Sequence, residues 1–128
     1  MNLRSLIALA LIAGCGPTLA AGPPGVRSGV CFHERDVNNF RAVDERTVNI
    51  RVGISDVYRL HLFATCGGVT WAETIGLLSR PGEFICSGTA NDVEVFFHSE
   101  IGRRSCPVGS IEPLSAAQVA ALPKKQRP

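Results

Sequence analysis

The sequence predicts a single small α+β domain, mainly β, in which a small antiparallel sheet curls toward a barrel. A short internal helix, a C-terminal helix and two disulfides complete the predicted fold. Apolar and polar residues alternate with the period of a strand in several short segments, which turn-forming residues separate. Four cysteines are spread through the same region. The 128 residues, 45% apolar and 19% charged, have the composition of a folded chain.

The first three strands form a predicted meander. Residues 40–43 are followed by the charged triplet Asp44-Glu45-Arg46, which is typical of a hairpin turn, and then by the alternating residues 47–52. A second turn at residues 53–56 leads into a third alternating strand at residues 58–62. The apolar positions of these strands share one face, so we expect that face to be buried in a common core.

A short internal helix is expected after the third strand. The run Thr-Trp-Ala-Glu at residues 70–73 fits a capping box, and the apolar spacing that follows fits one face of a helix. The helix would end by Arg80, because Pro81 disfavours helical geometry in the residue before it.

Three more strands and a helix are expected beyond it. The strands are residues 82–86, 93–97 and 106–114, with a turn at Asn91-Asp92 and a loop at residues 102–104. Pro107 and Gly109 interrupt the last strand, so it is bulged or lies at a sheet edge. Residues 115–122 begin with a second capping box, Ser115 with Gln118, and Pro123 ends this C-terminal helix.

The first 14 residues have the layout of a signal peptide. Residues 1–4 are polar with one positive charge, and residues 6–12 form an apolar run too short to span a bilayer. The sequence Ile12-Ala13-Gly14-Cys15 resembles the lipobox of bacterial lipoproteins. By this resemblance the chain is cut before Cys15, which becomes the lipid attachment residue and anchors the chain to a membrane. The alternative is ordinary secretion, with a cut near Ala20 or Ala21 that removes Cys15.

The rest of the chain divides into three parts. Residues 15–29 are rich in Gly, Pro, Ala and Ser and are expected to form a flexible tether, residues 30–122 a single β-rich domain, and residues 123–128 a basic, solvated tail. Gly16 stands where inner-membrane lipoproteins carry an aspartate, which favours the outer membrane and the periplasm-facing side of the cell envelope. A soluble periplasmic or secreted protein is the alternative.

Four cysteines remain if Cys15 carries lipid. An even number in an exported chain predicts two disulfides, and four cysteines allow three pairings. We expect Cys31–Cys106 and Cys66–Cys86, because the first and last strands often meet when a sheet closes. Structural zinc sites need close cysteine pairs, and none is present here, so no metal is expected.

No catalytic residue can be assigned from the spacing of the side chains, and no cofactor is expected. A candidate polar binding patch lies at outward positions of neighbouring strands and consists of Asn49, Arg51, Arg59 and His61. Trp71 is a candidate aromatic contact, although a tryptophan near a disulfide more often packs against it. The net charge of +2 is too small for a typical nucleic-acid-binding domain of this size.

Several short motifs together are similar to a known family. They are residues 38–44, Arg46-Thr47-Val48, Tyr58-Arg59-Leu60, Cys66, residues 85–88 and Cys106-Pro107-Val108 with Ile111. They resemble a proteobacterial domain-of-unknown-function family of small exported proteins, numbered six-four-nine-one. The resemblance covers roughly residues 31–122. It implies an envelope location and disulfides, but no activity and therefore no functional residue.

The leading hypothesis is a cell-envelope lipoprotein without enzymatic activity, acting as a binding module of the inhibitor or accessory kind. Its partner would be an envelope protein or a glycan. One alternative is a small periplasmic hydrolase or thiol redox enzyme, with His61, His98, Glu94 and the cysteines as candidates. The other is a structural component of the envelope.

Overall fold

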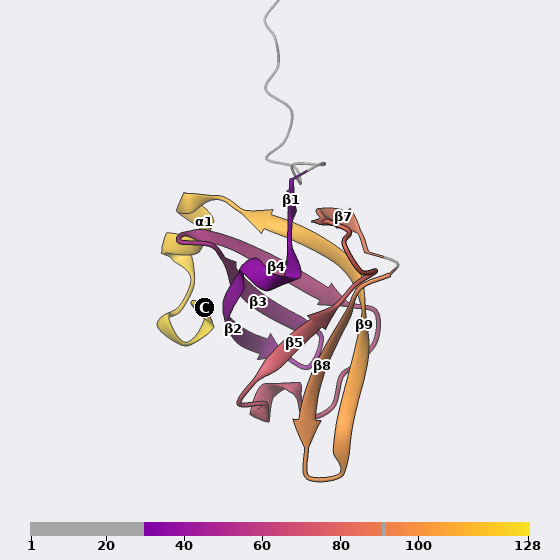
Figure 1. The fold of residues 1–128 in the computed structure, drawn as a ribbon. Coiled ribbons are helices and arrows are strands. Elements are labelled where there is room, and N and C mark those ends of the chain that lie inside the picture. The colour runs from indigo at the N-terminus through magenta and orange to yellow at the C-terminus, as the bar shows by residue number, and fades with distance from the viewer. Residues whose placement is uncertain (1–29, 91) are drawn as a thin grey trace, which may run out of the picture.

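A curled antiparallel sheet forms most of the molecule. The computed structural model describes residues 30–90 and 92–128, so the expected signal peptide, the expected lipid attachment residue Cys15 and the expected tether lie outside the described residues. Within the described part, seven strands form one sheet. Its order is β2 (Val37–Asp44), β3 (Thr47–Val52), β4 (Asp56–Leu62), β9 (Gly102–Leu114), β8 (Glu94–Ser99) and β5 (Ile75–Leu78), and β7 (Gly88–Thr89) also pairs with β9 (Figure 1).

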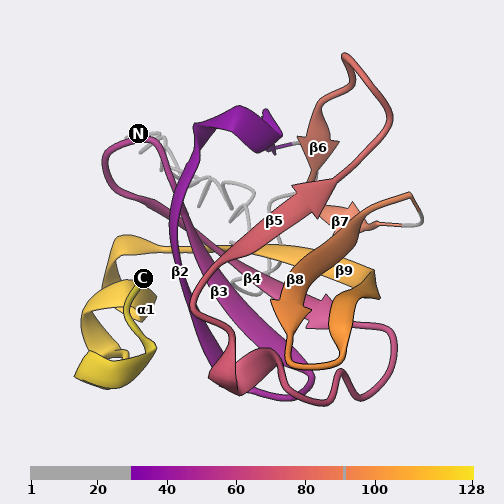
Figure 2. The same cartoon turned by 60° about the horizontal axis from the view of Figure 1, so that its bottom comes forward.

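The sheet bends into a half-barrel whose two edge strands are β2 and β5 (Figure 2). Short turns cover these edges. The 3₁₀ turn η1 (Glu34–Asp36) packs against β5, and the 3₁₀ turn η2 (Val69–Trp71) packs against β2. The hydroxyl of Ser79 donates to a carboxylate oxygen of Glu34 at 3.2 Å across the first contact. Covered edges protect the sheet from pairing with other chains.

The predicted alternation of the first strands is confirmed. Val48 and Ile50 on β3 lie opposite Leu60 and Tyr58 on β4, and all four side chains are buried in the core inside the curl. The turn at Asp44-Glu45-Arg46 joins β2 to β3 as expected. The mainly β fold that the sequence predicts is therefore present.

Tyr58, the single tyrosine of the chain, gives a spectroscopic probe of this core. Its ring lies 4.6 Å from that of Phe32. Burial raises the pKa of the Tyr58 phenol above its usual 10.0, and the Asp56 carboxylate raises it further. We expect the phenolate absorbance to titrate above pH 10 in the folded protein and near 10 in denaturant. Because the unfolded phenol ionises first, stability should fall as the pH rises past about 10. Titration of the folded protein at 10 or below would contradict this.

The last strand is irregular for the reason that the sequence suggested. His61 pairs with Ser110 but Leu62 pairs with Val108, so Gly109 is an extra residue that forms a bulge in β9. Pro107 has no amide hydrogen to donate, but its carbonyl accepts from Phe63 at 2.9 Å. The strand is bulged and central rather than at an edge, and it begins at Gly102, where a loop was expected.

The predicted internal helix is wrong. Residues 69–71 form only the 3₁₀ turn η2, and residues 75–78 form β5, which pairs with β8. Ile75 and Leu77 fit the period of a strand, and Gly76 is a poor helix former. The Phe96 ring on β8 covers Gly76 so closely that a side chain there would collide with it. Pairing with β8 therefore outweighs the local capping-box signal.

Of two smaller expectations, one changes and one is confirmed. The strand expected at residues 82–86 shrinks to β6 (Ile85–Cys86), which pairs with β1 (Cys31–Phe32) in a two-stranded sheet apart from the main one. The C-terminal helix is confirmed as α1 (Ala116–Ala121). Its capping box is present, because the Gln118 amide donates to the Ser115 hydroxyl at 3.2 Å and the Ser115 amide to the Gln118 side chain at 2.7 Å. Asn91 lies outside the described residues.

Two disulfides are present among the described residues, but their expected pairing is wrong. The bonds are Cys31–Cys86 and Cys66–Cys106, with Cα–Cα distances of 4.0 Å and 6.0 Å. Cys31 lies directly opposite Cys86 in the β1–β6 pair. Cys66 follows β4, the neighbour of β9, and therefore reaches Cys106. Cys66 and Cys106 are 1% and 8% exposed, whereas Cys31 and Cys86 lie on the surface.

Candidate functional site

Two residues of the expected polar patch, Asn49 and Arg51, hold the chain's own C-terminus, and a third, Arg59, bonds to Asn49. Asn49 is 0% exposed, the one buried polar residue in the part of the chain that the structure describes. Its amide nitrogen donates to the Gln126 carbonyl at 2.9 Å, and its side-chain oxygen accepts from Arg59 Nε at 3.1 Å. A guanidinium nitrogen of Arg51 donates to the main-chain oxygen of Pro128.

We call residues 115–128 the C-terminal strap, which comprises α1 and the 3₁₀ turn η3 (Lys124–Gln126). It runs from β9 to β2 over the outer face of the sheet. Arg127 closes it by donating to the carbonyls of Leu122 at 2.9 Å and Ala120 at 2.8 Å, at the end of α1 where a positive charge is favourable. Of the expected basic tail at residues 123–128, Lys124, Lys125 and Arg127 are exposed, whereas Pro128 is buried.

The sequence held one signal of this strap. Val57 lies on the same face of β4 as Arg59 and His61, which is the outer face of the sheet. An exposed strand face normally carries polar residues at such positions. Val57 and Leu122 are both buried, although neither belongs to the main core. The strap on the outer face accounts for their burial. An apolar residue at an outward position thus pointed to a covering segment.

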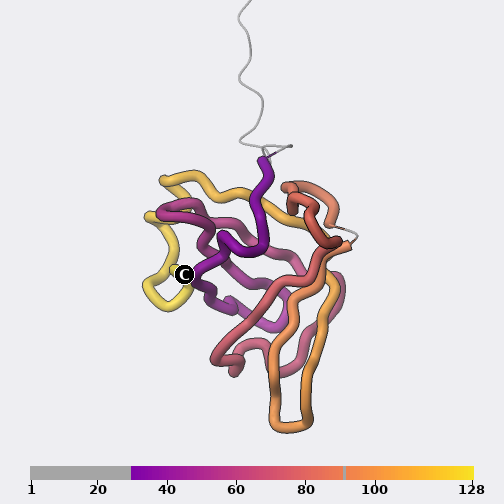
Figure 3. Tube along the Cα trace, viewed as in Figure 1, coloured from indigo at the N-terminus to yellow at the C-terminus, as the bar shows by residue number. Residues whose placement is uncertain are grey.

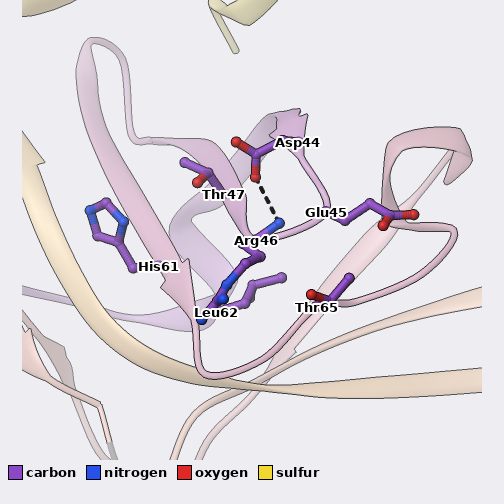
Figure 4. A pocket seen from close by; sticks show the side chains of 7 residues that line it. All are labelled: Asp44, Glu45, Arg46, Thr47, His61, Leu62 and Thr65. Atoms are coloured by element: carbon purple, nitrogen blue, oxygen red, sulfur yellow. Dashed lines mark hydrogen bonds between the residues drawn. The ribbon is translucent and has the colours of Figure 1, made fainter.

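His61, the fourth residue of the patch, faces a different environment. Its Nε2 lies 3.1 Å from a carboxylate oxygen of Glu112 on β9, and both side chains are partly exposed. His61 also lines an open pocket of about 670 Å³ at the β2–β3 turn (Figure 4). The lining residues are Asp44, Glu45, Arg46, Thr47, His61, Leu62 and Thr65.

The backbone fixes the walls of this pocket. The Arg46 amide donates to the Asp44 carboxylate at 2.7 Å, which closes the turn. The Arg46 carbonyl accepts from Leu62 at 2.8 Å, and the Glu45 carbonyl accepts from Cys66 at 2.7 Å. Because Cys66 is itself bonded to Cys106, the turn and the following loop are tied to the centre of the sheet. The charged side chains of the pocket are thus presented from a constrained backbone.

Exposed apolar side chains lie on the same end of the half-barrel. We call this end, formed by residues 44–47, 63–71 and 99–102, the loop end. Phe63, Trp71 and Ile101 are 74%, 88% and 84% exposed there. Trp71 therefore does not pack against a disulfide. The β8–β9 turn and the loops of this end lie at the bottom of Figures 1 and 2, whereas β1 lies at the top.

The first described residues are remote from the loop end. The chain enters through β1 at the top of Figure 3, and the β8–β9 turn is at the bottom. Of the other exposed apolar residues, Ile54 lies in the β3–β4 turn, away from the loop end, and is 97% exposed. Ile54 is therefore a matched control for Ile101.

The candidate enzymatic residues are not brought together. His61 pairs with Ser110 and His98 with Arg103, so the two histidines are seven residues apart along β9. At the rise of a strand this is roughly 20 Å. Glu94 lies four residue pairs from His98 on the β8–β9 ladder, and its carboxylate accepts from the hydroxyl of Ser105. All four described cysteines are in disulfides.

The described residues contain neither a metal-binding cluster nor a membrane-spanning helix. No three His, Cys, Asp or Glu side chains within residues 30–90 and 92–128 cluster closely enough to hold a metal ion. In the same part of the chain, no helix has the length and apolar character needed to cross a bilayer.

Comparison with known proteins identifies a family. A family model described as "Family of unknown function (DUF6491)" matches residues 2–128. Comparison with the curated proteins and with solved structures finds no match. The family model covers nearly the whole chain, including the segments that resembled this family in the sequence.

Proposed function

The chain belongs to the family of unknown function DUF6491, and we propose that it is a lipid-anchored cell-envelope protein whose loop end binds an envelope protein. In this proposal Cys15 carries the lipid, residues 15–29 form the tether, and the folded part acts as an inhibitor or accessory module. The observation that carries the binding role is the exposure of Phe63, Trp71 and Ile101 at the end of the half-barrel that also holds the charged pocket.

The envelope location is supported by the N-terminal sequence and by the disulfides. Residues 1–14 fit a signal peptide that ends before a lipobox cysteine. Disulfides persist mainly in oxidising compartments such as the periplasm. The two observations are independent, because one concerns the leader and the other the folded part.

The chemistry of the loop end suits a protein partner. Tryptophan and arginine are enriched among residues that dominate binding energy, and contiguous exposed apolar surface marks interaction sites. Here exposed Trp71, Phe63 and Ile101 lie at the same end as Arg46 and the acidic side chains of the β2–β3 turn. An apolar centre with a rim of mixed charge is the usual anatomy of such an interface.

The position of the anchor leaves this surface accessible. The described fold begins at the end opposite the loop end (Figure 3). A tether of about 15 residues spans at most roughly 50 Å when extended. The loop end would then point away from the membrane that holds Cys15.

Acylation is tested by the intact mass of the protein from its native host. We expect a chain that begins at Cys15 with acyl groups attached, and four thiols that become available only after reduction. Cys15→Ser is the control and should release a soluble, unacylated protein. A mature chain that starts after Ala20 or Ala21 would overturn the lipid anchor.

Binding is tested with a photo-crosslinking residue placed at position 71 and, as the control, at position 54. Both positions are exposed, so both variants should fold. We expect a discrete protein adduct in cells from position 71 and none from position 54. Trp71→Ala should then weaken the purified complex by at least about 30-fold, the loss typical of a hot spot of 2 kcal/mol. Equal crosslinking from both positions, or an adduct with glycan alone, would contradict a protein partner.

A further inference from the structure

The two disulfides are interleaved along the chain, because each bond has one cysteine of the other bond inside its loop. Among the four cysteines of the described residues, the first in sequence order bonds the third and the second bonds the fourth: Cys31–Cys86 and Cys66–Cys106. Neither native bond joins neighbouring cysteines. A chain that oxidises its cysteines in the order in which they emerge would instead make Cys31–Cys66 and Cys86–Cys106.

Loop lengths in the unfolded chain also oppose the native pairing. The native bonds close separations of 55 and 40 residues. Three non-native bonds close shorter loops: the separations are 35 for Cys31–Cys66 and 20 each for Cys66–Cys86 and Cys86–Cys106. If the probability of closing a loop falls as the inverse three-halves power of its length, native pairs make up roughly a fifth of the disulfides that form first. Most chains would thus begin with a wrong bond.

A wrong early bond conflicts with the fold. Cys66 and Cys106 are buried whereas Cys31 and Cys86 are exposed, so a bond between one of each would join a core cysteine to a surface one. Cys31 and Cys86 are on the surface, at the start of the folded part. We therefore expect a mispaired chain to pack its core incompletely, which leaves its disulfides accessible to an attacking thiolate.

We infer that this protein is a client of a thiol–disulfide isomerase, which converts the consecutive pairing into the interleaved one. The inference rests on the proposed function in one respect, because export delivers the cysteines in order to an oxidising compartment. The partner is defined by its chemistry: an accessible thiolate of low pKa that attacks disulfides in incompletely folded chains.

The conversion needs only thiol–disulfide exchange. The isomerase thiolate attacks the Cys31 sulfur of Cys31–Cys66, which forms a mixed disulfide and releases the Cys66 thiolate. That thiolate attacks the Cys106 sulfur of Cys86–Cys106, which forms Cys66–Cys106 and releases the Cys86 thiolate. The Cys86 thiolate then attacks Cys31 in the mixed disulfide, forms Cys31–Cys86 and restores the isomerase thiolate. Each step breaks one S–S bond and makes another, so no net oxidation occurs.

The test begins with refolding in vitro. Reduced and denatured mature chain, residues 15–128 with Cys15→Ser, is oxidised by a thiol-free oxidant, alone or with a catalytic amount of a purified thiol–disulfide isomerase. The disulfides are mapped by mass spectrometry. Without isomerase we expect mostly non-native pairings, and with it at least a threefold rise in native pairing. Isomerase with alkylated active-site cysteines should have no effect.

A double variant supplies the matched control. Cys31→Ser with Cys86→Ser leaves only Cys66 and Cys106, which have no wrong partner, so the isomerase should not change its yield of native bond. Native pairing of the four-cysteine chain at the same rate and yield without isomerase would overturn the inference.

An experiment in cells separates the inference from the proposed function. In a host that lacks its isomerase, the exported chain should accumulate with consecutive pairs, whereas the double variant should be unaffected. Native pairing in that host would also overturn the inference. If the chain stays reduced in the cytosol, the proposed location fails, while the refolding result still decides the isomerase dependence.

Discussion

Replacing Cys66 and Cys106 together by alanine should lower the free energy of unfolding by about 4 kcal/mol, as the chain-entropy model gives for a loop of this length. The bond spans 40 residues and both cysteines are buried in the core. The total stability of a domain this small is about 5–15 kcal/mol, so the variant should be close to unfolding. Urea denaturation followed by circular dichroism measures the difference.

The surface disulfide supplies the comparison. The same entropy argument gives about 4 kcal/mol for Cys31–Cys86. However, that bond joins strands of only two residues, outside the main sheet. Without it, β1 and β6 can fray while the sheet stays folded, and this freedom of the native state offsets part of the loss. Cys31→Ala with Cys86→Ala should therefore destabilise less. An equal or larger loss would show that β1 is as essential as the core.

Accessibility separates the two bonds as well. A reductant must reach a sulfur atom to attack it. Cys31 and Cys86 are exposed and Cys66 and Cys106 are not, so mild reduction of the native protein should free the first pair and leave the second. Alkylation and peptide mapping distinguish the two pairs. Simultaneous release of all four thiols would mean that opening is global.

The strands that could be predicted are those whose pattern and environment agree. Residues 47–52 and 58–62 alternate because one face meets the core and the other does not. Ser115 with Gln118 marked the C-terminal helix because both halves of its capping box are local. In these segments the signal lies within a few residues and needs no knowledge of the rest of the fold.

The errors concern contacts between distant segments. The run at residues 70–73 looked like a helix start, but pairing of β5 with β8 decides the conformation that follows. The disulfide pairing depends on β1 meeting β6, two segments of two residues each with no pattern of their own. The patch of Asn49, Arg51 and Arg59 was placed on the correct face, but the segment that covers it lies about 70 residues away.

Asn49→Ala should release this covering segment. The substitution leaves the Gln126 carbonyl without its donor and Arg59 Nε without its acceptor, next to a side chain that is 0% exposed. An unsatisfied buried group costs about 1–3 kcal/mol, and because Gln126 and Arg59 are partly exposed we expect the lower part of this range, so the opening of the C-terminal strap should become about tenfold more frequent. The main core, which does not include Asn49, should keep its structure.

Trypsin reports this opening directly, because Lys124 and Lys125 lie in the turn η3 that Asn49 holds down. If cleavage requires local release of the strap, the cleavage rate is proportional to the fraction of molecules in which the strap is open. We therefore expect roughly tenfold faster cleavage after these lysines in Asn49→Ala. Thr47→Ala, on the same face of β3 but in the pocket rather than under the strap, is the control and should cleave at the parent rate.

The same experiment distinguishes a local effect from a global one. If Asn49 mainly fastens the strap, the thermal midpoint should fall less than for loss of the Cys66–Cys106 bond, while cleavage after Lys124 and Lys125 accelerates. If Asn49 instead supports the whole sheet, cleavage should accelerate throughout the chain. Unchanged cleavage in Asn49→Ala would mean that Val57, Leu122 and the Arg51 contact with Pro128 suffice to hold the strap. The outer face would then be closed mainly by packing, and its buried amide would add little.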